Sequence, residues 1–198
     1  MLIDFRNGNA QKLANLLRGQ HGPRRRAMGH RVSSPAFPFI TLTNGSSSQT
    51  FTTSLVNVAL DVEVQNTGAD LFTFDDTNDA VTINQPGWYD IDVALDCICQ
   101  GWSVGTEPWE TISVIIYETL SGGSPTIIPY GIRVSGVHAD MAAAGISVPL
   151  DIHLPYEAAG GTKISIKIVV TADGGATPSV ILIQNGEGDF NRLTITKK

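Results

Sequence analysis

The side chains able to bind metals or perform acid–base chemistry are few in this 198-residue chain, and most lie far apart. Its 4 histidines are scattered, and no pair has the spacing of zinc ligands. The sequence lacks the Gly-Lys pair of a phosphate-binding loop. We therefore expect a protein that is not an enzyme and needs no cofactor.

One acidic stretch concentrates the hard oxygen ligands that calcium prefers. Asp75, Asp76, Asn78 and Asp79 lie close together, with Thr77 among them. The stretch lacks the pattern of an EF-hand loop. It is therefore a candidate calcium site, with a solvated polar turn as the alternative.

The two cysteines, Cys97 and Cys99, lie two positions apart, on one face of an expected strand. Regular strand rise separates their α-carbons by roughly 6.6 Å, near the upper limit for a disulfide. We expect buried thiols in a chain made in a reducing compartment.

The N-terminus has no apolar segment like that of a secretory signal, and no run approaches the ~18 apolar residues of a membrane span. We therefore expect no membrane association.

These cysteines end the most regular stretch of the chain, in which a Pro86-Gly87 turn precedes a long alternating run. A period of two over more than ten residues indicates a strand with one buried face. The predicted core face comprises Tyr89, Ile91, Val93, Leu95, Cys97 and Cys99. Asp90, Asp92 and Asp96 fall on the other face, where like charges repel unless they meet water or a basic partner.

The rest of the chain from residue 36 onward also predicts β-structure. Short apolar or alternating runs, including residues 51–55, 58–64 and 127–134, are separated by turn signals, and the chain holds 20 glycines. Pro129 assigns its run to a sheet edge or a bulge. About ten strands at this spacing predict an all-β fold, an antiparallel jelly-roll sandwich over residues 36–198.

Residues 1–35 differ from this body in composition and form an extended basic arm. They hold seven basic residues against one acid, a net +6, whereas the remaining six bases and 18 acids give the body −12. Leu13 and Leu17 have helical spacing, which predicts one short helix. Either a disordered tail or an arm that orders on a partner fits this pattern. As a docking arm, its contact residues would be Arg6, Lys12, Leu13, Leu17, Arg18, Arg24, Arg25, Arg26 and Arg31.

Several motifs of the body together resemble a known fold family. Residues 72–74 (Phe-x-Phe), 81–83 (Val-Thr-Ile) and 86–93 (Pro-Gly-Trp-Tyr-x-Ile-x-Val) are similar to the opening strands of tumour necrosis factor-like and complement globular-head jelly rolls. Residues 160–166 resemble the family's late Gly-Asp-x-Val-x-Val strand, and residues 189–195 its closing strand. The resemblance implies a homotrimer around a three-fold axis.

A short basic arm in place of the family's usual stalk resembles the jelly-roll proteins that decorate bacteriophage virions. We therefore expect a trimeric capsid decoration or cement protein. It would be made in the host cytoplasm, and its arm would bind the major capsid protein or another virion protein on the capsid exterior. The alternative is a head-fibre or tail-fibre knob that binds a host-surface receptor. Binding to nucleic acid through the arginine triplet is a third hypothesis, which the net −12 of the body disfavours.

Overall fold

The computed structural model describes residues 37–45, 48–100, 109–138, 147–171, 179–182 and 191–198. Over these residues the chain forms thirteen strands, which pair antiparallel in two sheets. This arrangement confirms the predicted all-β sandwich. The strands are β1 (Phe39–Thr43), β2 (Gln49–Phe51), β3 (Val56–Asn57), β4 (Val62–Asn66), β5 (Phe72–Asp75), β6 (Ala80–Ile83), β7 (Gly87–Gln100), β8 (Trp109–Thr119), β9 (Thr126–His138), β10 (Ser147–Ala158), β11 (Thr162–Thr171), β12 (Ser179–Leu182) and β13 (Arg192–Lys197).

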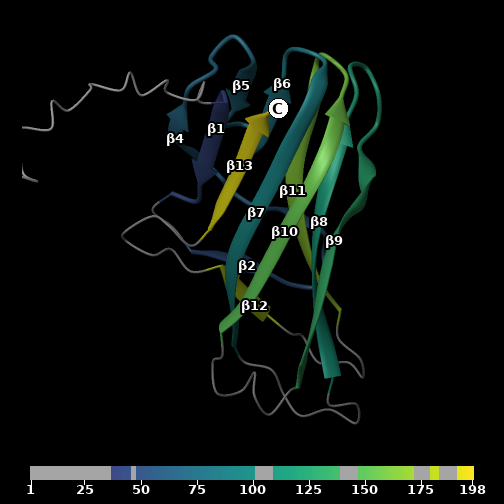
Figure 1. The fold of residues 1–198 in the computed structure, drawn as a ribbon. Helices are drawn as coiled ribbons and strands as arrows, with labels where there is room; N and C mark the ends of the chain where they lie inside the picture. The colour runs from purple at the N-terminus through teal and green to yellow at the C-terminus, as the bar shows by residue number, and fades with distance from the viewer. Residues whose placement is uncertain (1–36, 46–47, 101–108, 139–146, 172–178, 183–190) are drawn as a thin grey trace, which may run out of the picture. The chain divides into compact units, whose positions relative to one another are not determined.

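Each sheet contains a strand that has partners along both of its edges. In sheet A, β12 and β13 pair with successive parts of one edge of β7, and β10 pairs along its other edge. β2 joins β12, and β1 followed by β4 joins β13. In sheet B the order is β5-β6-β11-β8-β9, and β3 joins β11 beside β6. Figure 1 shows β7 and β10 as long strands side by side. Within the described residues, β4 and β9 are among the terminal strands, each with one edge that pairs with no other strand.

The long alternating run forms β7, as its period predicts. Its pairing with β10 extends without a break from Gly87 opposite Ala158 to Ile98 opposite Ser147. The predicted core face is fully buried, because Tyr89, Ile91 and the alternate residues after them belong to the core cluster. The structure therefore places all six residues of the predicted core face in the core.

Apolar side chains from both sheets meet in one core. Ile112, Val114 and Ile116 of β8 are fully buried, as are the alternate residues of β11 and those of β7. The Tyr89 and Phe72 rings, one from each sheet, meet edge-to-face with centroids 5.9 Å apart. The Tyr89 hydroxyl donates a 2.8 Å hydrogen bond to the Gln85 carbonyl, so the buried ring keeps a partner for its polar atom.

Residues 51–64 differ from the two strands predicted there. β2 ends at Phe51, and the chain crosses between the sheets, because β3 pairs with β11 of sheet B and β4 pairs with β1 of sheet A. Val58 and Leu60 are buried in the core although neither lies in a strand. These alternate side chains are buried, which is why the sequence predicted strands here. The backbone, however, pairs first with β11 of sheet B and then with β1 of sheet A.

The arm and its predicted helix, residues 1–35, lie outside the described residues. Within the part of the chain that is described, no helix is long and apolar enough to cross a membrane.

Candidate functional site

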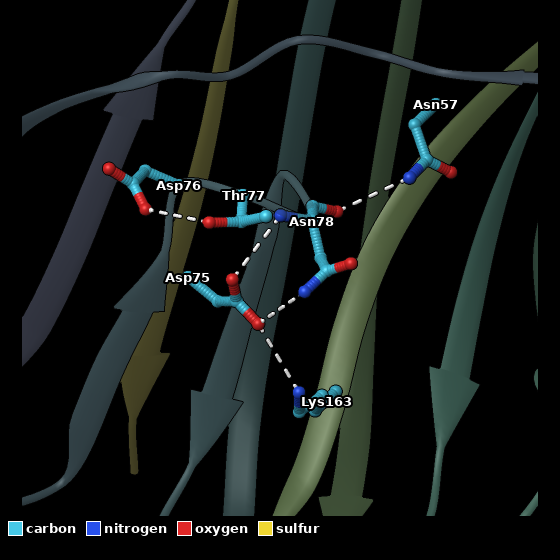
Figure 2. A network of polar contacts seen from close by, with 6 residues as sticks. All are labelled: Asn57, Asp75, Asp76, Thr77, Asn78 and Lys163. Carbon is cyan, nitrogen blue, oxygen red and sulfur yellow. Dashed lines mark hydrogen bonds and ion pairs between the residues drawn. The ribbon is translucent and has the colours of Figure 1, made fainter.

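The turn between β5 and β6 contains the predicted calcium ligands, and its side chains bond to one another (Figure 2). Asp75 Oδ1 accepts a 3.2 Å bond from the backbone N–H of Asn78, and Asp75 Oδ2 accepts a 2.9 Å bond from Asn78 Nδ2. Lys163 Nζ of β11 lies 3.2 Å from the same Oδ2. The bonds from Asn78, followed by Lys163, hold the pKa of Asp75 below its usual range.

The remaining acids of the turn do not converge with Asp75. Asp76 accepts a 3.4 Å contact from the Thr77 hydroxyl. Asp79 has a left-handed backbone (φ 50°), and burial, followed by the charges of Asp61 and Asp75, raises its pKa. Within the described residues, no three or more His, Cys, Asp or Glu side chains are placed to hold a metal ion. The contacts instead make Asp75 the acceptor that closes the turn and orients Lys163.

Beside this turn, the outward face of sheet B contains a polar hollow of about 230 Å³. In the register, Ala80 of β6 lies opposite Ser165 of β11. These two small side chains leave space between longer neighbours. The hollow is lined by Asn57, Asn78, Ala80, Thr119, Pro125, Lys163, Ser165 and Lys167.

The strand period of β11 brings its two lysines to this hollow. Lys163, Ser165 and Lys167 occupy alternate positions and share the outward face, since Ile164 and Ile166 between them are buried. The Lys167 ammonium lies 4.8 Å from the ring centroid of Tyr117 on β8, a cation–π contact.

A second hollow of about 290 Å³ adjoins the first. It is lined by Thr119, Leu120, Ser121, Gly122, Gly161 and Lys163. Thr119 and Lys163 border both hollows, and they are cross-strand partners in the register of β8 and β11. The pair therefore forms the ridge that separates the hollows.

The outward face of sheet A contains the three aspartates of β7, and each has a partner within the chain. Asp92 bonds to His153 Nδ1 on β10, and Asp96 accepts from Ser147. Lys198 Nζ lies 2.8 Å from Asp90 Oδ1. The bond to Asp92, together with its charge, raises the pKa of His153. Of the two alternatives for this face, water or a basic partner, the chain itself supplies basic partners to Asp90 and Asp92.

β9 is an edge strand and also contains a bulge, the two alternatives that Pro129 indicated. The register slips between Ile115 and Tyr117 of β8, so residues 128–131 lie opposite a single residue. Within the bulge, Tyr130 has φ 64° and is 94% exposed. Ile132 and Val134 beyond it are also exposed. A bulky residue in the left-handed region is uncommon and indicates a constrained segment.

The other predicted site residues have separate outcomes. The central-strand set lies in the core and contributes packing, and burial raises the pKa of the Cys97 thiol to about 12. The arm residues lie outside the described part of the chain. Sequence reasoning missed the hollow, although the alternation of Lys163, Ser165 and Lys167 already placed these side chains on an outward face.

Comparison with solved structures identifies the fold. The Eiger tumour necrosis factor of S. frugiperda matches with a TM-score of 0.61 and 11% identity, over 82% of this chain and 93% of that chain. The fold is that of the tumour necrosis factor-like jelly rolls. Murine APRIL, solved at pH 5.0, matches with a TM-score of 0.53 and 12% identity, over 82% of this chain and 99% of that chain. The sequence matches no protein-family model and no curated protein.

Proposed function

We propose that the chain is a homotrimeric structural protein that decorates the exterior of a bacteriophage capsid and is attached by residues 1–35. The observation that carries the proposal is the division of charge between a +6 arm and a −12 jelly-roll body. A body this acidic gains little from bulk attraction to an acidic shell, so attachment requires a segment of opposite character. The arm supplies that segment.

Two exposed apolar strips support the trimer. On the terminal strand β9 of sheet B, Ile132 and Val134 are exposed on one face and Arg133 on the other, and on the terminal strand β4 of sheet A, Val62 and Val64 are exposed on one face and Glu63 on the other. Different patches with opposite charges suit a heterologous contact, in which one surface of a protomer meets another surface of the next. Three such contacts close a ring.

A trimer also explains how weak arms attach firmly. Each arm carries six net positive charges and the leucines of the predicted short helix, and linkage through the body raises the effective concentration of the other two arms. Avidity then exceeds single-arm affinity by ~10²–10⁴. Fully extended, 35 residues reach up to ~115 Å, which is ample for contacts around a three-fold axis.

Add-back to stripped particles tests the attachment. Replacing Arg24, Arg25 and Arg26 with Ser should weaken co-sedimentation and reduce its salt sensitivity, because charge attraction is screened by salt. Replacing Leu13 and Leu17 with Ser should weaken it with the salt sensitivity unchanged. Full binding by both variants at all salt concentrations would contradict attachment by the arm.

A head-fibre or tail-fibre knob that binds a host receptor is the second candidate, and the polar hollow on sheet B favours it. Imaging of intact particles separates the two. Density at three-fold points of the capsid supports decoration, and density at the tip of a tail or fibre supports the knob.

A further inference from the structure

We propose that the hollow over Ala80 and Ser165 binds an acidic saccharide, with a sugar carboxylate on Lys167 and sugar hydroxyls on the surrounding amide and hydroxyl groups. The inference rests on the geometry of sheet B and does not depend on virion attachment. It goes beyond the knob hypothesis because it specifies the site and the chemistry of the ligand.

The lining of the hollow matches a ligand rich in hydroxyl groups. Two amide side chains, Asn57 and Asn78, lie along it, and the hydroxyls of Thr119 and Ser165 complete a set of groups that both donate and accept. Asn57 Nδ2 donates a 3.2 Å bond to the Asn78 carbonyl, which ties β3 to the turn (Figure 2). These groups sit on paired strands and a bonded turn, so they are held in place before a ligand arrives.

Charge selects an acidic ligand. The body has only six basic residues against 18 acids, yet two of the six line this one hollow. Within the described residues, Lys167 has no carboxylate partner, and its ammonium lies against the Tyr117 ring. A ligand carboxylate can therefore pair with Lys167 without breaking an existing ion pair.

Lys163 is held differently, and this difference gives the site a measurable signature. Its ammonium contacts Asp75, which in turn is fixed by two bonds from Asn78. Asp75 thus competes with an acidic ligand for Lys163. Removing the charge of Asp75 should strengthen binding, whereas a purely structural role for the turn predicts no gain.

The dimensions suit a small sugar unit. A hollow of about 230 Å³ is smaller than the pockets of ~300–1,000 Å³ that hold drug-sized ligands, so it accommodates roughly one sugar ring. The second hollow of about 290 Å³, across the ridge formed by Lys163 and Thr119, provides room for a linked neighbouring sugar.

Titration calorimetry on the full chain tests the proposal with 3′-sialyllactose, which carries one carboxylate. Lactose is the neutral counterpart and inorganic phosphate the simple anion. We expect sialyllactose to bind about tenfold more tightly than lactose, since a charge-assisted hydrogen bond is lost with the carboxylate. Phosphate should bind more weakly than sialyllactose, because it cannot engage the amide and hydroxyl groups together.

Matched variants assign the binding to the hollow. Lys167→Gln should lower the affinity for sialyllactose about fivefold or more, and Asp75→Asn should raise it by about two- to fivefold. Lys197→Gln removes the same charge from β13 of sheet A and should leave the affinity unchanged. All three variants retain the basic arm, so any contribution of the arm is constant, and thermal melts check that each remains folded.

Three results would overturn the proposal: no binding of sialyllactose, phosphate binding as tightly as sialyllactose, or equal losses for Lys167→Gln and Lys197→Gln. A normal affinity in Asp75→Asn would overturn the competition between Asp75 and the ligand. Loss of particle attachment in arm variants has no bearing on these measurements, so failure of this proposal and of the decoration proposal can be distinguished.

Discussion

Truncation of Leu95 tests the register on which the core depends. Leu95 is 1% exposed, and its cross-strand partner on β10, Leu150, is fully buried. Leu→Ala in a core costs about 2–5 kcal/mol, depending on how far the surroundings collapse into the cavity. β7 is paired with β10 throughout this region, so collapse is limited and we expect about 3–4 kcal/mol for Leu95→Ala. With a urea m-value of ~2 kcal/mol/M, the unfolding midpoint falls by about 1.5–2 M.

Ile98→Ala is the matched control, because Ile98 lies on the same strand but on the opposite, half-buried face. It should cost less than half as much when both variants are measured at the same protein concentration, which matters for an oligomer. Leu95→Asp should prevent folding, since it places an unpaired charge in the core. Equal costs for the two alanine variants, or a soluble Leu95→Asp as stable as the wild type, would refute the register.

Three further predictions concern the thiol, the histidine and the proposed trimer contact. Burial raises the pKa of Cys97 to about 12, so a thiol reagent at pH 8 should label it only in denaturant, and rapid native labelling would contradict its burial. Asp92 raises the pKa of His153 above its usual 6.5, so the pair's modest stabilisation should be complete below pH 6.5 and disappear as the pH rises through the folded pKa. His153→Gln should therefore lower the melting temperature only at acidic pH. An equal loss at every pH would contradict this linkage. Arg133→Glu and Glu63→Arg should each weaken the trimer at least tenfold in light scattering, and the double reversal should restore it; two fully trimeric single variants would argue against this contact.

The sequence predicted best where burial alone determines the pattern. Strict alternation specified β7 and its core face, because a one-residue slip would expose every apolar side chain. Alternation at residues 58–64 misled, since Val58 and Leu60 are buried where the chain crosses between the sheets. Side-chain alternation reports burial and does not identify the backbone's hydrogen-bonding partner.

The hollow could not be predicted for a different reason. Lys163 and Asp75 are 88 positions apart, and their contact depends on β5, β6 and β11 being neighbours in sheet B. The sequence indicated outward lysines and a polar turn separately. Only the topology brings them together, because it places Lys163 beside the bonded turn.

Deletion of residues 2–34 tests the central claim most directly. The described core is built from residues 37–198, so the shortened chain should fold, and light scattering should report a trimer at micromolar concentration. Added to particles stripped of the protein and then pelleted, it should remain in the supernatant while the full chain co-sediments. If the shortened chain is a monomer, or if it co-sediments at full occupancy, a trimer anchored by its arms is contradicted.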